Sequence, residues 1–282
     1  MLLYRYFHSH AFETLKEAKL KASRITSFND PFEFLFITTG KVTAAMAREY
    51  ITSRLGNPEF IQLAAETVPG LRVAKNPKRV LEKNVPLMVA NMVKHSEEIT
   101  QMPLKLREQL ADRSIRVISF SRADIAPMDA ILLWSHYANM HEGIRIGFLF
   151  PKEIKHPFKL FEMKYRAKRF EIPFPQGLLN LDIGMFLVES AKVKSIAWEY
   201  EHEYRLLTHP ACCEQTMMPD SKQECFLSFE REWVRSVDFG VRCPQSEIER
   251  IMYLVKSTCA RDVVCRRAVF HKSEYALAYE NQ

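Results

Sequence analysis

Glycine is scarce in this chain, with 8 residues among 282, against about 7% in an average protein. There is no G-x-G-x-x-G, G-x-x-x-x-G-K-[ST] or G-x-S-x-G pattern, so glycine-rich phosphate loops and nucleophile elbows are not expected. His136 and His141 are five residues apart, and no H-E-x-x-H is present, so one helix face would not offer both imidazoles to a metal. These absences argue against the Rossmann, P-loop, serine-hydrolase and zincin classes, and we expect no metal.

Cysteine is absent before Cys212, and the six cysteines that follow include no C-x-x-C pair. That spacing excludes a zinc ribbon. The N-terminus lacks the apolar core of a secretory signal, and no run approaches the 18 apolar residues of a membrane span. We therefore expect a cytoplasmic protein with free thiols and no membrane partner.

Composition and pattern predict an α+β fold. Apolar residues make up 47% of the chain and charged residues 26%, as in globular proteins. We expect one domain over residues 1–282, with a mixed or antiparallel sheet and a mostly helical insertion at about 41–112 after the first strand. The periodicity predicts strands at 2–7, 116–121, 143–150, 158–165, 198–207, 225–229, 233–239 and 263–270, and helices at 127–140, 178–197 and 246–260.

The chain is mildly basic, with 40 Lys and Arg against 34 Asp and Glu. Part of the excess lies in two stretches. The first holds Arg72, Lys75, Lys78, Arg79 and Lys83, and the second holds Lys164, Arg166, Lys168 and Arg169. We interpret both as solvated surface, with a phosphate-bearing ligand or RNA as the alternative.

The segment Ser27-Phe28-Asn29-Asp30-Pro31-Phe32-Glu33 reads as a turn. Asn and Asp side chains bond to nearby backbone, and the residue before proline avoids the helical region. We expect Asn29 and Asp30 to bond to the backbone of this loop, and Glu33 to point inward toward a basic partner.

Two segments place polar side chains next to aromatic residues and are candidates for ligand binding. Arg5 lies between Tyr4 and Tyr6 in the first predicted strand, where it is either solvent-facing or a guanidinium that grips a phosphate. Trp134, Tyr137 and His141 share one helical face. That face either belongs to the core or forms a stacking wall for a planar ring, with His141 as its polar handle and Gly143 ending the helix.

The segment 198–205 reads Trp-Glu-Tyr-Glu-His-Glu-Tyr-Arg. In a strand, alternation would place Glu199, Glu201 and Glu203 on one face, with Arg205, and the aromatic residues on the other, core-building face. Carboxylates about 7 Å apart along a strand repel one another away from water. This face is therefore either solvated or a site where a carboxylate meets a cation, a hydroxyl or a developing positive charge.

Four motifs together resemble the bacterial domain-of-unknown-function family DUF2971. They are SFNDPFE at 27–33, SFS at 119–121, WSHY with H-x-G at 134–143, and WEYEHEYR at 198–205. The resemblance spans about residues 4–210 and implies no particular activity.

The order Arg5, Ser119-Phe120-Ser121 and Glu201-His202-Glu203 is also similar to the R / S-T-S / E-x-E pattern of ADP-ribosyltransferases, although Phe120 replaces the central threonine. This resemblance implies an ADP-ribosyltransferase-like fold and a site for NAD. Arg5 would hold a phosphate, and Ser119 and Ser121 would orient the ribose. Glu203 would be the catalytic carboxylate that stabilises the oxocarbenium-like transition state, and Glu201 would assist the acceptor.

We therefore expect an NAD-consuming ADP-ribosyltransferase or NAD glycohydrolase, such as a toxin or phage-defence factor, with a protein or nucleic-acid acceptor. Trp134, Tyr137 and His141 would join Arg5, Ser119 and Ser121 in binding the cofactor. The alternatives are a non-catalytic nucleotide- or nucleic-acid-binding module and a partner-binding protein whose polar residues are dispersed. Convergence of Arg5, Ser119 and Glu203 in one cleft would favour the enzyme.

Overall fold

A computed structural model describes residues 1–35, 37–39, 42–65, 68–95, 112–151, 159–173, 188–217, 223–259 and 262–282. The chain divides into two compact units. The first comprises Met1–Phe34, Leu110–Lys168 and Ala191–Gln282, and the second comprises Leu35–Gln109 and Arg169–Ser190. Residues 178–187 of the helix predicted at 178–197, and residues 96–111 of the expected insertion, lie outside the described residues.

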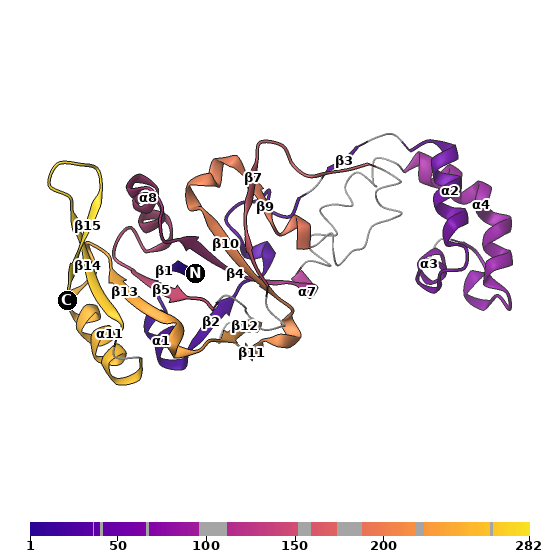
Figure 1. Cartoon of the computed structure of the whole chain (residues 1–282). Coiled ribbons are helices and arrows are strands. Elements are labelled where there is room, and N and C mark those ends of the chain that lie inside the picture. Colours follow the sequence, from indigo (N-terminus) through magenta and orange to yellow (C-terminus); the bar gives the residue numbers. More distant parts are fainter. Residues whose placement is uncertain are drawn as a thin grey trace. The chain divides into compact units, whose positions relative to one another are not determined.

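An eight-stranded sheet forms the first unit (Figure 1), in the order β15-β14-β13-β5-β1-β4-β10-β6. Its neighbours are antiparallel except the parallel pair β13–β14, which the helix α11 (Gln245–Thr258) connects. The strands are β1 (Leu2–Phe7), β4 (Arg116–Arg122), β5 (Ile144–Leu149), β6 (Lys159–Glu162), β10 (Glu203–Thr208), β13 (Val234–Phe239), β14 (Val264–Phe270) and β15 (Leu277–Asn281).

Smaller elements complete this unit. A three-stranded sheet has the order β11-β12-β2, and β7 pairs with β9 in parallel. Their bounds are β2 (Lys19–Ala22), β7 (Lys164–Arg166), β9 (Val193–Ser195), β11 (Glu214–Met217) and β12 (Gln223–Ser228). The helices are α1 (Ala11–Glu17), α7 (Asp112–Ser114) and α8 (Pro127–Tyr137), with 3₁₀ turns η1 (Ile25–Ser27), η4 (Ile196–Glu201), η5 (Pro210–Cys212) and η6 (Arg231–Trp233).

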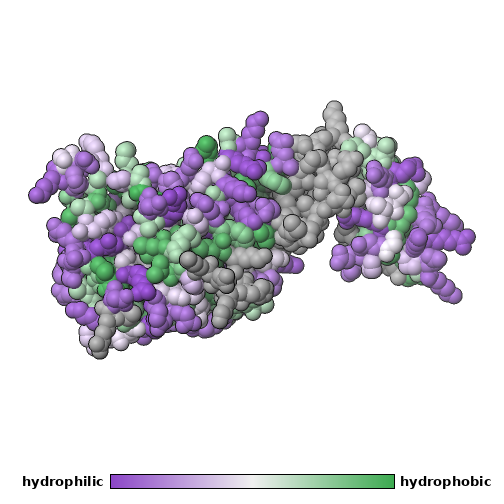
Figure 2. Space-filling view, viewed as in Figure 1, coloured by the Kyte–Doolittle hydropathy of each residue, from purple (hydrophilic) through white to green (hydrophobic). Residues whose placement is uncertain are grey.

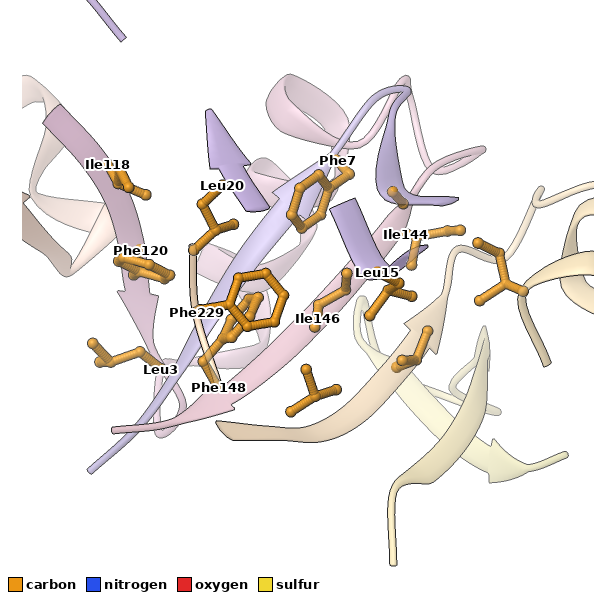
Figure 3. Packing of buried hydrophobic residues seen from close by; sticks show 14 of the residues in the cluster. Leu3, Phe7, Leu15, Leu20, Ile118, Phe120, Ile144, Ile146, Phe148 and Phe229 are labelled. Atoms are coloured by element: carbon orange, nitrogen blue, oxygen red, sulfur yellow. The ribbon is translucent and has the colours of Figure 1, made fainter. Parts of the chain in front are cut away.

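Alternation along the strands gives the large sheet one apolar face. Leu3 and Phe7 of β1 lie on it beside Phe148 and Ile144 of β5, their register partners. Residues from α1, α11 and the three-stranded sheet cover this face, including Leu15, Ile248, Leu20 and Leu227. Figure 3 shows Leu15 and Leu20 converging with the apolar side chains of β1 and β5. The rings of Phe148 and Phe229 meet edge to face with their centroids 5.2 Å apart. Their burial is the main stabilising contribution to this unit.

The second unit is helical over most of its described length. It holds α2 (Ala44–Arg54), α3 (Pro58–Ala64), η2 (Leu71–Val73) and α4 (Pro77–Lys94), with a short parallel pair of β3 (Ile37–Thr39) and β8 (Glu171–Pro173). A separate apolar cluster holds the helices together, with Ala47, Ile51, Leu81, Val85 and Val89 buried in it. The described residues thus confirm the helices expected after the first strand.

The α+β class predicted from the sequence is confirmed, with a sheet that is antiparallel apart from one parallel pair. An ADP-ribosyltransferase-like fold stays a prediction. Among the described residues, none of the helices combines the length and apolarity needed to cross a bilayer.

Candidate functional site

A cavity opens where β1 and β4 separate. These strands share only two register pairs, Leu3 with Arg122 and Tyr4 with Ser121, whereas β4 pairs with β10 over six. The cavity measures about 400 Å³, within the roughly 300–1,000 Å³ of small-molecule sites. Its lining includes Tyr4, Arg5, Tyr6, Ser23, Ser27, Phe28, Asn29, Glu33, Val117, Ser119, Phe120, Ser121, Leu133, His136, Tyr137, Lys194, Glu201, Glu203 and Arg205, all in the first unit.

The separation of the strands explains how residues from both faces of the sheet reach one cavity. By alternation, Arg5 lies on the side of Leu3 and Phe7. Ser121 and Glu203 lie on the opposite side, because they pair with each other across β4 and β10 and Ser121 also pairs with Tyr4. If β1 and β4 paired along their whole length, the sheet would separate Arg5 from Ser121 and Glu203. Because the pairing ends early, side chains from both faces line the cavity.

Arg5 is a half-buried cation without a carboxylate partner among the described residues. Its guanidinium donates hydrogen bonds to the main-chain oxygens of Ser119, at 3.4 Å, and Lys21, at 3.3 Å. Burial lowers the pKa of Arg5 to about 10. The side chain remains charged at neutral pH, and a ligand anion would stabilise that charge.

Lys194 lies among three buried carboxylates. Its ammonium nitrogen is 3.2 Å from Glu33 Oε1 and 3.0 Å from Glu203 Oε2, and it also donates to Glu201. The Lys194 side chain is 4% exposed. Burial opposes its charge, but the carboxylates of Glu203, Glu33 and Glu201 more than compensate and raise the pKa of Lys194 above its ordinary value.

Arg205 is the second cation of this cluster and is buried with it. Its Nε donates to Glu203 Oε1 at 2.7 Å, its Nη2 to Glu203 Oε2 at 3.1 Å and also to Glu33, and its Nη1 to the Ala191 carbonyl at 3.1 Å. The guanidinium therefore fixes the position of Glu203 on the same strand. It also ties the 27–33 loop to β10 through Glu33.

The cluster of Glu33, Glu201, Glu203, Lys194 and Arg205 carries one formal negative charge, since three carboxylates face two cations. Burial alone would raise the pKa of Glu203, but Arg205 and then Lys194 lower it to about 2. Burial raises the pKa of Glu33 and of Glu201. Glu203 is thus held as a carboxylate, and Glu201 is the better placed of the two to accept a proton.

Tyr137 connects α8 to the carboxylate cluster. Its hydroxyl donates to Glu201 and accepts from the Asn29 amide at 3.1 Å. Burial, and next the charge of Glu201, raise the pKa of Tyr137, which keeps the phenol protonated. The neighbouring His136 is exposed and lies 3.0 Å from the Tyr200 hydroxyl, with the two rings 5.9 Å apart at their centroids. Aromatic and phenolic groups therefore edge the cavity beside Glu201.

The strand predicted over 198–207 is wrong in its first half. Residues Ile196–Glu201 form η4, which the Ser195 hydroxyl caps, and β10 begins only at Glu203. Between them His202 has the left-handed φ of 42°, so the alternation expected for one strand does not hold. The turn instead brings Glu201 and Glu203 to the same ammonium group of Lys194.

The aromatic side of this segment is also not the core face expected for it. Trp198 and Tyr200 are half-buried, and Glu199 is exposed. The side chains of Glu201, Glu203 and Arg205 are the buried ones. The ion pairs with Lys194 and Glu33 are what make their burial tolerable.

The expectation that Trp134, Tyr137 and His141 form one wall is wrong for two of the three. Trp134 is fully buried, packs edge to face on Tyr6 and donates its Nε1 hydrogen to Tyr279 Oη at 3.1 Å. His141 follows the end of α8, with φ 71°, and its Nε2 lies 3.0 Å from Ser135 Oγ. The cavity lining includes Tyr137 but neither of the others.

Gly143 does not end the helix, because α8 stops at Tyr137. A methyl group at this position would lie 2.1 Å from the Phe7 carbonyl oxygen. The glycine therefore permits the close approach of the turn after α8 to β1.

The 27–33 loop meets its expectation in part. Asp30 accepts a hydrogen bond from the Phe32 backbone at 2.8 Å, as predicted. Glu33 points inward to Arg205 and Lys194, also as predicted. Asn29 is exposed and bonds to Tyr137 instead of to the loop backbone. Four residues of this loop line the cavity, namely Ser27, Phe28, Asn29 and Glu33.

The structure thus brings together Arg5, Ser119, Ser121, Tyr137, Glu201 and Glu203, whose roles in binding or catalysis stay predictions. The Ser119 side chain also helps to lower the pKa of Glu203, after Arg205 and Lys194. Lys194 was missed, because 193–195 was predicted to be helical and a single lysine carries no motif. The one available signal was indirect, namely that a buried carboxylate pair requires a cation nearby.

No group of three or more His, Cys, Asp or Glu side chains suited to a metal ion occurs in the part of the chain that the structure describes. All six cysteines are free, as predicted.

Comparison with known proteins finds that one segment of the chain is similar to a protein family. The model of the family described as "Protein of unknown function (DUF2971)" matches residues 133–206. The segment begins within α8, ends within β10 and includes β5, β6, β7, β9 and η4, and it carries Tyr137, Lys194, Glu201 and Glu203. The DUF2971 resemblance seen in the sequence is therefore confirmed over residues 133–206. No curated protein and no solved structure matches the chain.

Proposed function

We propose that the protein is an NAD-consuming enzyme that cleaves the nicotinamide–ribose bond and transfers ADP-ribose to an acceptor or to water. The main support for this proposal is the distribution of charge around the cavity. Arg5, with no carboxylate partner among the described residues, contributes a positive charge, and the Glu33–Glu201–Glu203–Lys194–Arg205 cluster contributes a net negative one. A nucleotide whose diphosphate is anionic and whose reacting ribose becomes cationic matches this distribution.

In the proposed complex Arg5 holds a phosphate oxygen, and Ser119 and Ser121 orient the ribose. The bond between ribose C1′ and the nicotinamide nitrogen breaks, and its electron pair leaves with neutral nicotinamide. Glu203 stabilises the oxocarbenium-like ribose, because it stays ionised beside Arg205 and Lys194. A carboxylate already fixed by these contacts needs little reorganisation as positive charge develops.

The acceptor then attacks C1′ of the ribose through an oxygen or nitrogen atom, which forms the new bond with its lone pair and loses a proton. Glu201 is assigned as the proton acceptor, since burial raises its pKa and Tyr137 orients one of its oxygens. A bound water as acceptor makes the reaction NAD hydrolysis. A side chain or nucleobase as acceptor makes it ADP-ribosylation.

The test is to incubate the purified chain with NAD and measure released nicotinamide by liquid chromatography. Glu203→Gln should lower the rate by a factor on the order of 10²–10³, as expected for the loss of one preorganised electrostatic group. Glu199→Gln is the matched control, because Glu199 lies four residues before Glu203 in the adjoining η4 turn but is exposed. Circular dichroism must show both variants folded. An inactive wild type, or equal rates in wild type and Glu203→Gln, would reject the proposal.

A second candidate function is nucleotide binding without chemistry. It is favoured by the contacts of Glu203, because both of its carboxylate oxygens already accept hydrogen bonds, from Arg205 and Lys194. In that case Arg5 and Tyr137 would bind a nucleotide and the carboxylate cluster would only shape the cavity. Saturable binding of NAD or ADP-ribose with no nicotinamide release would select this function.

A further inference from the structure

A cationic patch occupies the start of α4 in the helical unit. It consists of Lys75, just before the helix, and Lys78, Arg79 and Lys83 within its first two turns. All four side chains are exposed, and no ion pair joins any of them to another described residue. Figure 2 shows a largely hydrophilic surface over this unit.

The sequence at the start of α4 is strongly basic. Within residues 72–83 five basic side chains accompany a single acidic one, Glu82. Residues 72–83 therefore carry a formal charge of +4, against +6 for the whole chain, and basic residues clustered in one stretch are typical of polyanion binders.

These cations are poorly placed for the stability of α4 itself. The N-terminus of a helix carries partial positive charge, which favours acidic side chains there and disfavours basic ones. The first turn of α4 contains no acidic residue, and Lys78 and Arg79 directly follow the Asn76 cap and Pro77. The patch thus opposes the helix dipole, and an anionic partner would relieve that repulsion.

The packing of α4 argues against an anionic membrane as the partner of this patch. The apolar side chains of α4, among them Leu81, Val85 and Val89, are buried in the unit's core, so they cannot insert into a membrane as an amphipathic helix does. Val73 and Leu87 are exposed apolar side chains, but two single residues do not form such a face.

Aromatic rings are also absent from the patch. Tyr50 and Phe60 pack against each other at 6.2 Å between ring centroids, and both lie against the unit's core. Binding of single strands relies on exposed aromatic rings on which the bases stack. A cationic patch that lacks exposed aromatic rings is instead suited to contact the regularly spaced phosphates of a duplex.

We propose that Lys75, Lys78, Arg79 and Lys83 bind the phosphate backbone of double-stranded nucleic acid without reading its sequence. This inference does not depend on the reaction proposed for the cavity. Its readout is binding by the helical unit, which the two cavity proposals neither require nor exclude.

The experiment measures binding of the full chain to a fluorescently labelled duplex of about 20 base pairs by anisotropy over a series of salt concentrations. The test variant carries Lys75→Gln, Lys78→Gln, Arg79→Gln and Lys83→Gln. Glutamine retains good helix propensity, and circular dichroism checks that α4 remains. The matched control changes four exposed cations of the first unit, Lys164, Arg166, Lys168 and Lys272, to Gln, for the same loss of net charge.

For wild type, the logarithm of the association constant should fall linearly with the logarithm of salt concentration, by about 0.9 per neutralised phosphate. In the test variant, the magnitude of this slope should be smaller by about 1 for each removed cation that contacts a phosphate. The variant should also bind the duplex at least about 10-fold more weakly near 0.1 M salt. The control should keep the wild-type slope. Equal losses in both variants, tighter binding to anionic phosphatidylserine vesicles, or equally tight binding to a single strand would overturn the proposal.

Discussion

Replacing Lys194 by methionine removes the cation that the three carboxylates of the cavity share. Glu33, Glu201 and Glu203 would then face Arg205 alone, which changes the formal charge of the buried cluster from −1 to −2. Removing one partner of a buried ion pair leaves an uncompensated charge and costs about 3–5 kcal/mol. Lys194 contacts all three carboxylates and its side chain is 4% exposed, so we expect a loss in this range.

The loss should depend on pH in a definite direction. Without Lys194, the pKa of Glu201, already raised by burial, rises further above its unfolded value. A carboxylate whose pKa is raised by folding binds more protons in the folded state, so unfolding free energy falls as pH rises. The deficit of Lys194→Met relative to wild type should therefore be larger at pH 8 than at pH 5.

Urea denaturation at both pH values measures the effect, with thermal melting as a second readout if the variant is only marginally stable. Lys168→Met serves as the control, because Lys168 is exposed and should change stability by less than about 0.5 kcal/mol. The double variant Lys194→Met with Glu201→Gln removes one charge of each sign and should lose less stability than Lys194→Met alone. A Lys194→Met protein within about 1 kcal/mol of wild type, at either pH, would refute the charge argument.

Three further outcomes follow from the structure. The pKa of Glu203 is lowered to about 2, so the ionised carboxylate stabilises the folded state above its unfolded pKa of about 4.3, and this contribution is lost as the pH falls toward 2. Glu203→Gln should therefore flatten the dependence of the urea midpoint on pH between these two values. Trp134→Phe leaves the Tyr279 hydroxyl without its donor and should cost about 1–3 kcal/mol in urea unfolding, while nucleotide affinity, measured by calorimetry, stays within about two-fold of wild type. Gly143→Ala would place a methyl group 2.1 Å from the Phe7 carbonyl, so its melting temperature should fall clearly, whereas Gly56→Ala, with open space around it, should change little.

Much of the large sheet could be predicted from the sequence, because its strands alternate regularly and bury one face. The strand expected at 143–150 is β5 at Ile144–Leu149, and the one expected at 263–270 is β14 at Val264–Phe270. The helix expected at 246–260 is α11 at Gln245–Thr258. Long, strongly periodic segments determine their own structure, since a shift of register would expose the apolar face.

The candidate site was less predictable, for two physical reasons. The residues around 193–203 adopt β9, η4 and a left-handed His202, and the ion pairs of Lys194 and Arg205 stabilise that conformation through contacts distant in sequence. The cavity itself depends on where β1 leaves β4 after Tyr4, which no local pattern encodes. Residue type therefore identified Arg5, Glu201 and Glu203 as candidates, but only the three-dimensional structure showed Lys194.

The most direct test of the cavity's role is calorimetric titration of ADP-ribose, which contains the phosphates and the ribose but no bond to nicotinamide. We predict saturable one-site binding to wild type, and binding weaker by about 10- to 100-fold for Arg5→Gln, as expected for the loss of hydrogen bonds to a charged phosphate. Lys164→Gln, an exposed cation outside the cavity lining, should bind as wild type does. Absence of ADP-ribose binding to the folded wild type, or equal affinity of wild type and Arg5→Gln, would contradict the assignment of this cavity to a nucleotide.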